Sequence, residues 1–193
     1  MQKILFYIMI KEMNFKFLYF CLWFGLVKSI DIVSMEGPVN KRSVDEVIYE
    51  FHTNAEENDW IFYLNTPGGS VMEGARLLPY LETKNVTCVV DKAYSMGFLL
   101  LQACSKRFML PYGSIMQHDM YMGLEDDYTK IKSYMAFLTK VYDRLTTMQY
   151  TRIGLSKEEY LRKIKDNWWL TAEEAVQENC ADDIIERMDI ILQ

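Results

Sequence analysis

A strand-like run that ends in two glycines and passes directly into a helical segment is the feature that most restricts the fold. The apolar run Trp60–Leu64 predicts a buried strand, which leads through Asn65-Thr-Pro-Gly-Gly69 to a helix over roughly 70–83. The pattern then repeats, because the apolar run Val86–Val90 leads to a helix that begins at Ser95. Strands alternating with helices form a mostly parallel sheet covered by helices, so the sequence predicts the α/β class.

Further elements extend this alternation on both sides. Three more strands are expected, at Ile30–Met35, Arg107–Leu110 and Ser114–Gln117. The Ser/Thr-x-x-Glu pattern of a capping box predicts three helix starts. These boxes are Ser43–Glu46, Ser156–Glu159 and Thr171–Glu174.

The longest expected helix covers residues 128–150. Apolar side chains recur there every three or four residues for more than four turns. They are Ile131, Tyr134, Met135, Leu138, Val141, Tyr142, Leu145 and Met148. We expect this stripe to lie on an apolar surface for its whole length.

Composition excludes several classes of function. The formal net charge is −6, and such an acidic balance gives no reason to expect nucleic-acid binding. The sequence has neither a CxxC pair nor a Cys/His cluster, so no metal is expected. Cys88 lies in an apolar run and Cys104 in a helical one. We interpret both as small core residues carrying free thiols in a reducing compartment.

Residues 1–29 form an apolar N-terminal extension that we treat separately from a domain over residues 30–193. An apolar run of 11 residues, 17–27, follows Lys16. It is too short to span a bilayer and has the length of the hydrophobic region of a signal peptide. An organelle-targeting extension, an upstream start codon read as coding, and a buried helix are the alternatives. The expected location, cytoplasmic or organellar, depends on this choice, and membrane association is expected only if the extension is retained as an anchor.

Three local features could carry chemistry. Asn65–Ser70 joins a strand to a helix start, where glycines and exposed N–H groups suit an anion, although such a segment is usually only a turn. Ser95 stands at a second strand-to-helix junction and could be a helix cap or a nucleophile. His118 follows an expected strand and could be a structural residue or a general base. The other histidine, His52, has no motif around it.

The order of these segments, from about Ile32 to Ile185, resembles the Clp protease proteolytic subunit. The similar stretches are Phe62–Val71, Ala93–Phe98, Lys106–Pro111, Ile115–His118, Leu170–Ala175 and Ala181–Ile185. The resemblance implies a spiral of βα units like that of the crotonases, with residues 128–150 as a long handle helix.

Carried over residue by residue, the resemblance makes Ser95 the nucleophile and His118 the base of a serine endopeptidase that works through an acyl-enzyme. The N–H groups of Gly69 and Met96 are expected to form the oxyanion hole. The residues expected to bind the peptide substrate are Gly68, Ser70, Met120, Tyr121 and Met122.

The third member of the catalytic triad is the point at which the sequence departs from the family pattern. An ungapped alignment through Leu170 and Thr171 places Asn167 where the family has Asp, and a shift of one residue would place Asp166 there instead. The sequence after His118 also differs, because Asp119 follows the base and the acidic run 125–127 lies downstream.

The same resemblance implies partners. Heptameric rings stacked in pairs are expected, together with an AAA+ unfoldase that uses ATP, while this chain itself needs no cofactor. Unfolded proteins or peptides are the expected substrates. One alternative is a non-catalytic or weakly active scaffold subunit of a mixed ring. The other is a crotonase-type enzyme, which shares the fold but does not require the Ser95 and His118 pair.

Overall fold

A computed structural model describes residues 31–53 and 59–186. The chain divides into two units, 1–30 and Asp31–Gln193, and all of the described residues belong to the second. The prediction for residues 1–29 therefore lies outside the described part. Within that part, no helix has the length and apolar character needed to cross a membrane.

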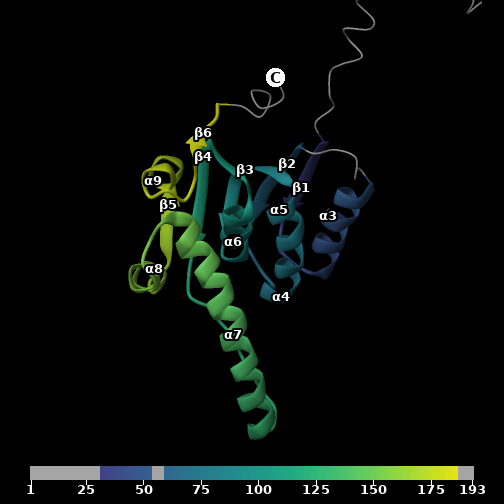
Figure 1. The fold of residues 1–193 in the computed structure, drawn as a ribbon, viewed down its shortest axis with the longest axis vertical. Helices are drawn as coiled ribbons and strands as arrows, with labels where there is room; N and C mark the ends of the chain where they lie inside the picture. The colour runs from purple at the N-terminus through teal and green to yellow at the C-terminus, as the bar shows by residue number, and fades with distance from the viewer. Residues whose placement is uncertain (1–30, 54–58, 187–193) are drawn as a thin grey trace, which may run out of the picture. The chain divides into compact units, whose positions relative to one another are not determined.

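The centre of the described unit is a sheet with strand order β1-β2-β3-β4-β5, and β6 pairs with β4 beside this path. The strands are β1 (Asp31–Glu36), β2 (Asp59–Thr66), β3 (Asn85–Tyr94), β4 (Lys106–Gln117), β5 (Trp168–Thr171) and β6 (Asp183–Ile184). Strands β1 to β4 run parallel, β6 runs parallel to β4, and β5 is antiparallel to β4. The predicted α/β class with a mostly parallel sheet is confirmed (Figure 1).

Helices connect successive strands. They are α3 (Lys41–Thr53), α4 (Val71–Gly74), a 3₁₀ turn (Ala75–Leu77), α5 (Leu78–Thr83), α6 (Met96–Ala103), α7 (Tyr128–Ile153), α8 (Lys157–Ile164) and α9 (Ala172–Gln177). In Figure 1, α5 and α6 lie in front of the sheet, and α9 packs beside β4. The helix expected over 70–83 thus exists as three short pieces, with Pro79 in the first turn of the last one.

Helix starts show where short-range patterns succeed and fail. The Thr171 hydroxyl and the Glu174 carboxylate form both hydrogen bonds of the predicted capping box, and Ser156 caps α8 as expected. The box predicted at Ser43 is wrong. The Asn40 side-chain oxygen accepts from the backbone N–H groups of Arg42 and Ser43, so α3 begins at Lys41.

Strand β4 was predicted as two strands and is one. Its first half pairs with β6 at Phe108 and Met109, and its second half pairs with β5 from Ser114 to Gln117. The pairing with β3 shifts register between Val90 and Lys92, which accommodates Pro111–Gly113 without ending the strand. The local breaker residues suggested two elements, but pairing with different neighbours keeps the strand continuous.

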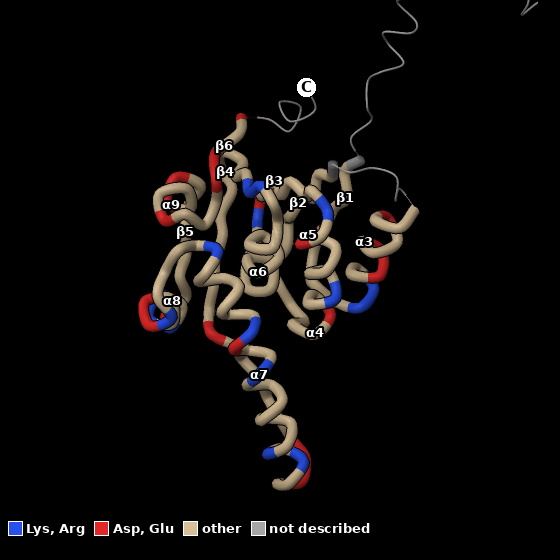
Figure 2. Tube along the Cα trace, in the orientation of Figure 1, with Lys and Arg blue, Asp and Glu red and all other residues tan. Residues whose placement is uncertain are grey.

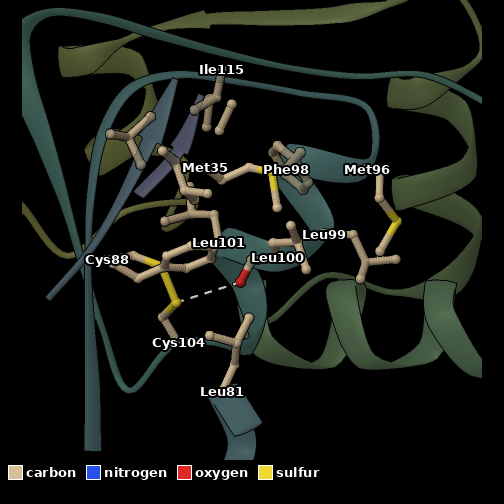
Figure 3. Packing of buried hydrophobic residues seen from close by; sticks show 14 of the residues in the cluster. Met35, Leu81, Cys88, Met96, Phe98, Leu99, Leu100, Leu101, Cys104 and Ile115 are labelled. Atoms are coloured by element: carbon tan, nitrogen blue, oxygen red, sulfur yellow. Dashed lines mark hydrogen bonds between the residues drawn. A yellow bond between two sulfur atoms is a disulfide. The ribbon is translucent and has the colours of Figure 1, made fainter. Parts of the chain in front are cut away.

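Packing of α6 against the sheet forms much of the core. The α6 side chains Phe98, Leu100 and Leu101 are fully buried with Met35 of β1 and Ile115 of β4 (Figure 3). Every residue from Met96 to Gln102 is buried. The segment that begins at Ser95 is therefore held on all sides, which fixes the position of its first turn.

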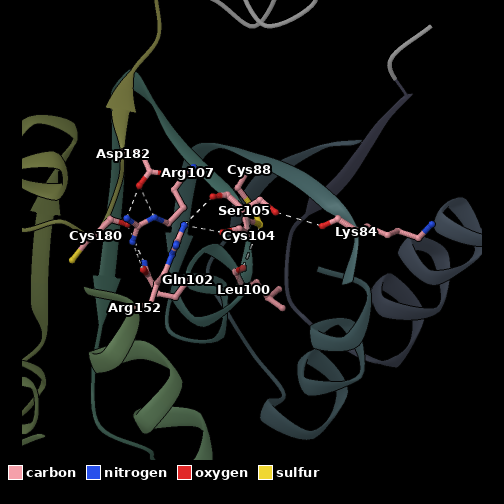
Figure 4. The surroundings of a disulfide bond; sticks show 10 residues. All are labelled: Lys84, Cys88, Leu100, Gln102, Cys104, Ser105, Arg107, Arg152, Cys180 and Asp182. Atoms are coloured by element: carbon pink, nitrogen blue, oxygen red, sulfur yellow. Dashed lines mark hydrogen bonds and ion pairs between the residues drawn. A yellow bond between two sulfur atoms is a disulfide. The ribbon is translucent and has the colours of Figure 1, made fainter. Parts of the chain in front are cut away.

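The core also contains a correction. Cys88 of β3 and Cys104, which follows α6, are buried as expected, but the structure joins them in a disulfide bond (Figures 3 and 4). The interpretation as two free thiols is wrong for this pair. Their pairing could not be predicted from sequence, because the contact between the middle of β3 and the end of α6 arises only from tertiary packing. Cys180 is a free, buried cysteine.

Beside the disulfide, a buried arginine ties the C-terminal segment to β4. Arg107 is 2% exposed and hydrogen-bonds the Asp182 carboxylate through its backbone N–H and its guanidinium (Figure 4). The same guanidinium donates to the side-chain oxygen of Gln102 and to the backbone oxygen of Asn179. These contacts place β6 at the edge of β4.

Helix α7 is longer than expected, and its N-terminal half is not covered by the rest of this chain. It projects from the sheet in Figure 1, and Tyr134, Met135 and Phe137 are 44%, 39% and 45% exposed. The predicted packing of the stripe over its whole length is wrong within the single chain. The buried residues of α7 begin at Leu138, and the others, Leu145, Thr146, Gln149 and Ile153, lie in its C-terminal half.

Candidate active site

Ser95 lies at a strained turn between β3 and α6. Its backbone has φ 54° and ψ −115°, a conformation that non-glycine residues rarely adopt. It occupies the N-cap position of α6, but its side chain makes no capping hydrogen bond. The backbone N–H donates to the Met116 carbonyl at 2.8 Å, which ties the turn to β4. The alternative that Ser95 is a simple helix cap is therefore not supported, and the hydroxyl is left free for another role.

Gly68 of the Pro-Gly-Gly segment packs closely against this turn, and Gly69 packs against Val39. A Cβ atom on Gly68 would lie 2.5 Å from the Tyr94 carbonyl oxygen and 2.7 Å from the Ser95 Cβ. Gly68 and Gly69 have φ angles of 90° and 147°, which side chains disfavour. The chain can therefore bring this loop against Ser95 only with glycine at these positions.

Two backbone N–H groups beside Ser95 are unpaired. Gly69 forms a parallel bridge with Val39, in which the bonds are made by the neighbouring Gly68 carbonyl and Ser70 N–H. Within the described residues, neither the Gly69 N–H nor the Met96 N–H has an acceptor. Met96 is also the first residue of α6, where the helix dipole favours negative charge. Unpaired donors at this place suit an oxyanion.

His118 follows directly after β4. Its Nδ1 atom lies 2.5 Å from the backbone oxygen of Asp119, and its backbone N–H donates to the Gln117 side-chain oxygen at 3.1 Å. A carbonyl oxygen can only accept, so Nδ1 carries the proton in this pair. The neutral ring then has an unprotonated Nε2, which is the form that a general base requires.

A cavity of about 350 Å³ brings most of the predicted residues together. Ser95, His118, Gly69, Met96, Met120 and Tyr121 all line it. We call it the site cavity. Three residues expected to bind substrate are outside its lining: Gly68, Ser70 and Met122. The Gly68 N–H and carbonyl are both hydrogen-bonded, and the Ser70 hydroxyl caps α4. Their role in binding substrate remains a prediction.

Neither candidate for the third triad position bonds His118 in this structure. Asp166 and Asn167 are both exposed and lie outside the lining of the site cavity. The antiparallel register between β4 and β5 ends at Gln117 opposite Trp168. One more step of that register would set Asn167 opposite His118, but the pairing ends before it and Asn167 has φ 60°. The choice between Asn167 and Asp166 stays a prediction.

A buried hydrogen-bond network beneath His118 was not predicted. The Gln149 side-chain oxygen accepts from the Gln117 amide and from the Tyr160 hydroxyl. The three side chains are 2%, 7% and 0% exposed for Gln149, Gln117 and Tyr160. We call them the polar network. The only local signal for this network is a glutamine, Gln149, at a buried position of an amphipathic helix. The two hydrogen-bond partners of Gln149 come from other elements, so no short segment contains the network.

Two other ionisable side chains, Tyr142 in the cavity lining and His52 elsewhere, have hydrogen-bond or charge partners of their own. Burial and the neighbouring Asp119 carboxylate raise the pKa of Tyr142, so its hydroxyl stays protonated at neutral pH. His52, the other histidine, bonds the Tyr80 hydroxyl at 3.0 Å and stacks edge-on against its ring. Within the described residues, no cluster of three or more His, Cys, Asp or Glu side chains is placed to hold a metal ion.

A serine at a strained strand-to-helix turn, a histidine that lines the same cavity and two unpaired N–H groups are the parts that serine hydrolases share. Comparison with known families agrees with this class. The family model for Clp protease matches residues 22–188 of the 193-residue chain. The chain belongs to the Clp protease family. The match begins within the stretch assigned above to the N-terminal extension.

Proposed function

We propose that this chain is a serine endopeptidase in which Ser95 attacks the peptide carbonyl and His118 takes the Ser95 proton. Membership of the Clp protease family supports peptidase chemistry in general. The observation that carries the proposal for these residues is the strained Ser95 turn, whose hydroxyl caps no helix while the Gly69 and Met96 N–H groups beside it are unpaired.

The proposed reaction follows from these groups. The Ser95 Oγ bonds to the carbonyl carbon while its proton passes to the His118 Nε2. The resulting oxyanion accepts hydrogen bonds from Gly69 and Met96, each worth a few kcal/mol in the transition state. The protonated imidazole then donates its proton to the leaving amine, and water releases the acyl group by the same steps in reverse.

Orientation of His118 has two candidate sources. In the single chain, the Asp119 backbone oxygen holds Nδ1, and it stabilises an imidazolium less than a carboxylate would. Asn167 could take that place only if the chain just before β5 rearranged. We propose Asn167 as the third residue, and Asp166 is the alternative.

Assembly and partners also belong to the proposal. The uncovered apolar half of α7 supports a multi-subunit particle, and the family supports stacked heptameric rings that work with an ATP-driven unfoldase. Figure 2 shows that this part of α7 carries no charged residue between Lys132 and Lys140. An assembly-only subunit is the second candidate, and the absence of a carboxylate bonded to His118 favours it.

Labelling with a fluorophosphonate tests the proposal. We expect one adduct per chain by intact mass, lost in Ser95→Ala and retained in Ser105→Ala, whose hydroxyl is exposed and remote from the site cavity. Absence of an adduct on folded, assembled protein would support the assembly-only subunit instead.

A further inference from the structure

The far wall of the site cavity is polar. It is formed by α7 and α8, which contribute the polar residues Thr146, Gln149 and Tyr160, while Ser95 and His118 come from other parts of the chain. Gln149 and Tyr160 are almost completely buried. A buried amide and a buried phenol require hydrogen-bond partners, so their unused bonding capacity indicates what the cavity can receive.

The side-chain amides of Gln117 and Gln149 each have an N–H group that donates no hydrogen bond among the described residues. The Gln149 oxygen already accepts two hydrogen bonds, and its nitrogen donates one N–H to the Leu145 carbonyl. The Gln117 oxygen accepts from the His118 backbone, and its nitrogen donates one N–H to Gln149. Each amide nitrogen carries two hydrogens, so each keeps one N–H without an acceptor among the described residues. The wall therefore offers donors to a bound group.

The charged residues that line the site cavity further restrict the chemistry of a bound group. Asp119 is the cavity's carboxylate, and the lining contains neither Lys nor Arg. A carboxylate on the ligand would face Asp119 without a counter-charge, which is costly in a partly dry site. Leu145 and Ile164 in the same wall offer apolar contact to a short methylene stem. A side chain with a short stem and an uncharged accepting end satisfies all of these groups.

We propose that the site cavity receives the side chain of the residue whose carbonyl Ser95 attacks, and that it selects glutamine or asparagine over apolar residues there. This inference rests on the proposed peptidase function and adds a substrate class to it. The side-chain amide oxygen accepts from the spare N–H groups of Gln117 and Gln149, and the Tyr160 hydroxyl oxygen can accept from the amide nitrogen. An apolar side chain would leave those donors unpaired.

Binding can be tested separately from turnover. In the Ser95→Ala protein, we would titrate short peptides that end in Gln, Leu, Glu or Arg and are otherwise identical, by calorimetry. The Gln peptide is expected to bind about tenfold more tightly than the Leu peptide, the difference that one unpaired buried donor makes. Equal binding, tighter binding of Leu, or preference for Arg or Glu would overturn the proposal.

A variant identifies the residues responsible. Gln117→Leu, Gln149→Leu and Tyr160→Phe together remove every side-chain donor and acceptor of the polar network and keep similar shapes. The preference of this variant is expected to fall to within about twofold of equality or to reverse toward Leu. Gln177→Leu, the same change at an exposed site on α9, is expected to keep the tenfold preference. A triple variant that folds, by its melting curve, and still prefers Gln tenfold would contradict the assignment.

The two proposals fail in different ways. If fluorophosphonate does not label Ser95 but the Gln peptide still binds more tightly, the cavity assignment stands and the peptidase proposal fails. If Ser95 is labelled and hydrolysis of matched substrates shows no preference for Gln over Leu in kcat/KM, only the substrate class is wrong.

Discussion

Gly68 and Ser95 lie so close together that a methyl group on Gly68 would stand 2.7 Å from the Ser95 Cβ. The loop that contains Gly68 therefore packs directly against the turn that contains Ser95. Because Gly69 follows directly, this contact also sets the place of one proposed oxyanion donor. A change that moves Gly68 away from Ser95 should disturb the serine and the donor together.

Gly68→Ala is expected to destabilise the protein by about 3 kcal/mol, since the new methyl overlaps Tyr94 and Ser95 and the residue has a positive φ. Fluorophosphonate labelling should slow by at least about tenfold, given that a misplaced oxyanion donor costs two or more orders of magnitude in rate. Gly123→Ala is the control, as no atom lies within 4 Å of the added methyl. Equal labelling rates for the two folded variants would show that the close contact does not matter.

Asn167→Asp is expected to speed the labelling of Ser95 by about tenfold or more, because a carboxylate stabilises the imidazolium and an amide does not. Asp166→Asn, one residue earlier, should change the rate by less than about twofold. Loss of labelling in Asp166→Asn, with no gain in Asn167→Asp, would instead assign the third position to Asp166.

The Arg107–Asp182 pair predicts how stability depends on pH. Burial alone would raise the pKa of Asp182, but the hydrogen bonds and charge of Arg107 together lower it below its usual value. A carboxylate with a lowered folded-state pKa stabilises the protein above its unfolded pKa of about 3.9, and this contribution is lost as the pH falls through the folded value.

Asp182→Asn should therefore cost about 3 kcal/mol at pH 7, because the buried Arg107 loses its counter-charge. The difference from the wild type should shrink as the pH falls below the unfolded pKa of about 3.9 toward the lowered folded pKa of Asp182. Urea unfolding of both proteins at pH 7 and pH 3 measures this difference in the free energy of unfolding. A difference that stays constant between these pH values would mean that Asp182 contributes nothing through its charge.

Tyr134→Asp should weaken assembly, because Tyr134 lies on the uncovered apolar part of α7 and stacks on Phe137. Native mass spectrometry is expected to show smaller particles than for the wild type. The subunit itself should keep its stability to within about 0.5 kcal/mol, as exposed substitutions usually do. Ala136→Asp, on the opposite side of the helix, should assemble normally. Unchanged particle size for Tyr134→Asp would place the subunit contacts elsewhere.

Local patterns predicted the elements that contain their own signal. The strand that ends at the glycines, the helix after Ser95 and the capped starts of α8 and α9 each depend on a few neighbouring residues. Strand β5 was missed because Trp168–Thr171 becomes a strand only by pairing with β4. The Asn40 cap was missed because the Ser43 pattern is equally acceptable in sequence, and only the course of the chain decides between them.

The candidate site also has residues that the sequence predicted and residues that it did not. Ser95, His118, Gly69 and Met96 were predicted from the resemblance of short segments to the Clp protease family, and all four line one cavity. The polar network was missed, since Gln117, Gln149 and Tyr160 are 11 to 43 positions apart and meet only when β4, α7 and α8 pack together. The same limit applies to Cys88 and Cys104, whose pairing depends on how α6 lies on β3.

Formation of an acyl-enzyme on Ser95 is the most direct test of the whole account. The assembled protein would be mixed with an activated peptide ester that ends in Gln, quenched in acid after seconds, and analysed by intact mass and peptide mapping. The account predicts an added mass equal to the peptidyl group, located on the fragment that contains Ser95 and absent in Ser95→Ala. Peptide that binds the folded, assembled protein without ever forming this adduct would contradict the proposed chemistry.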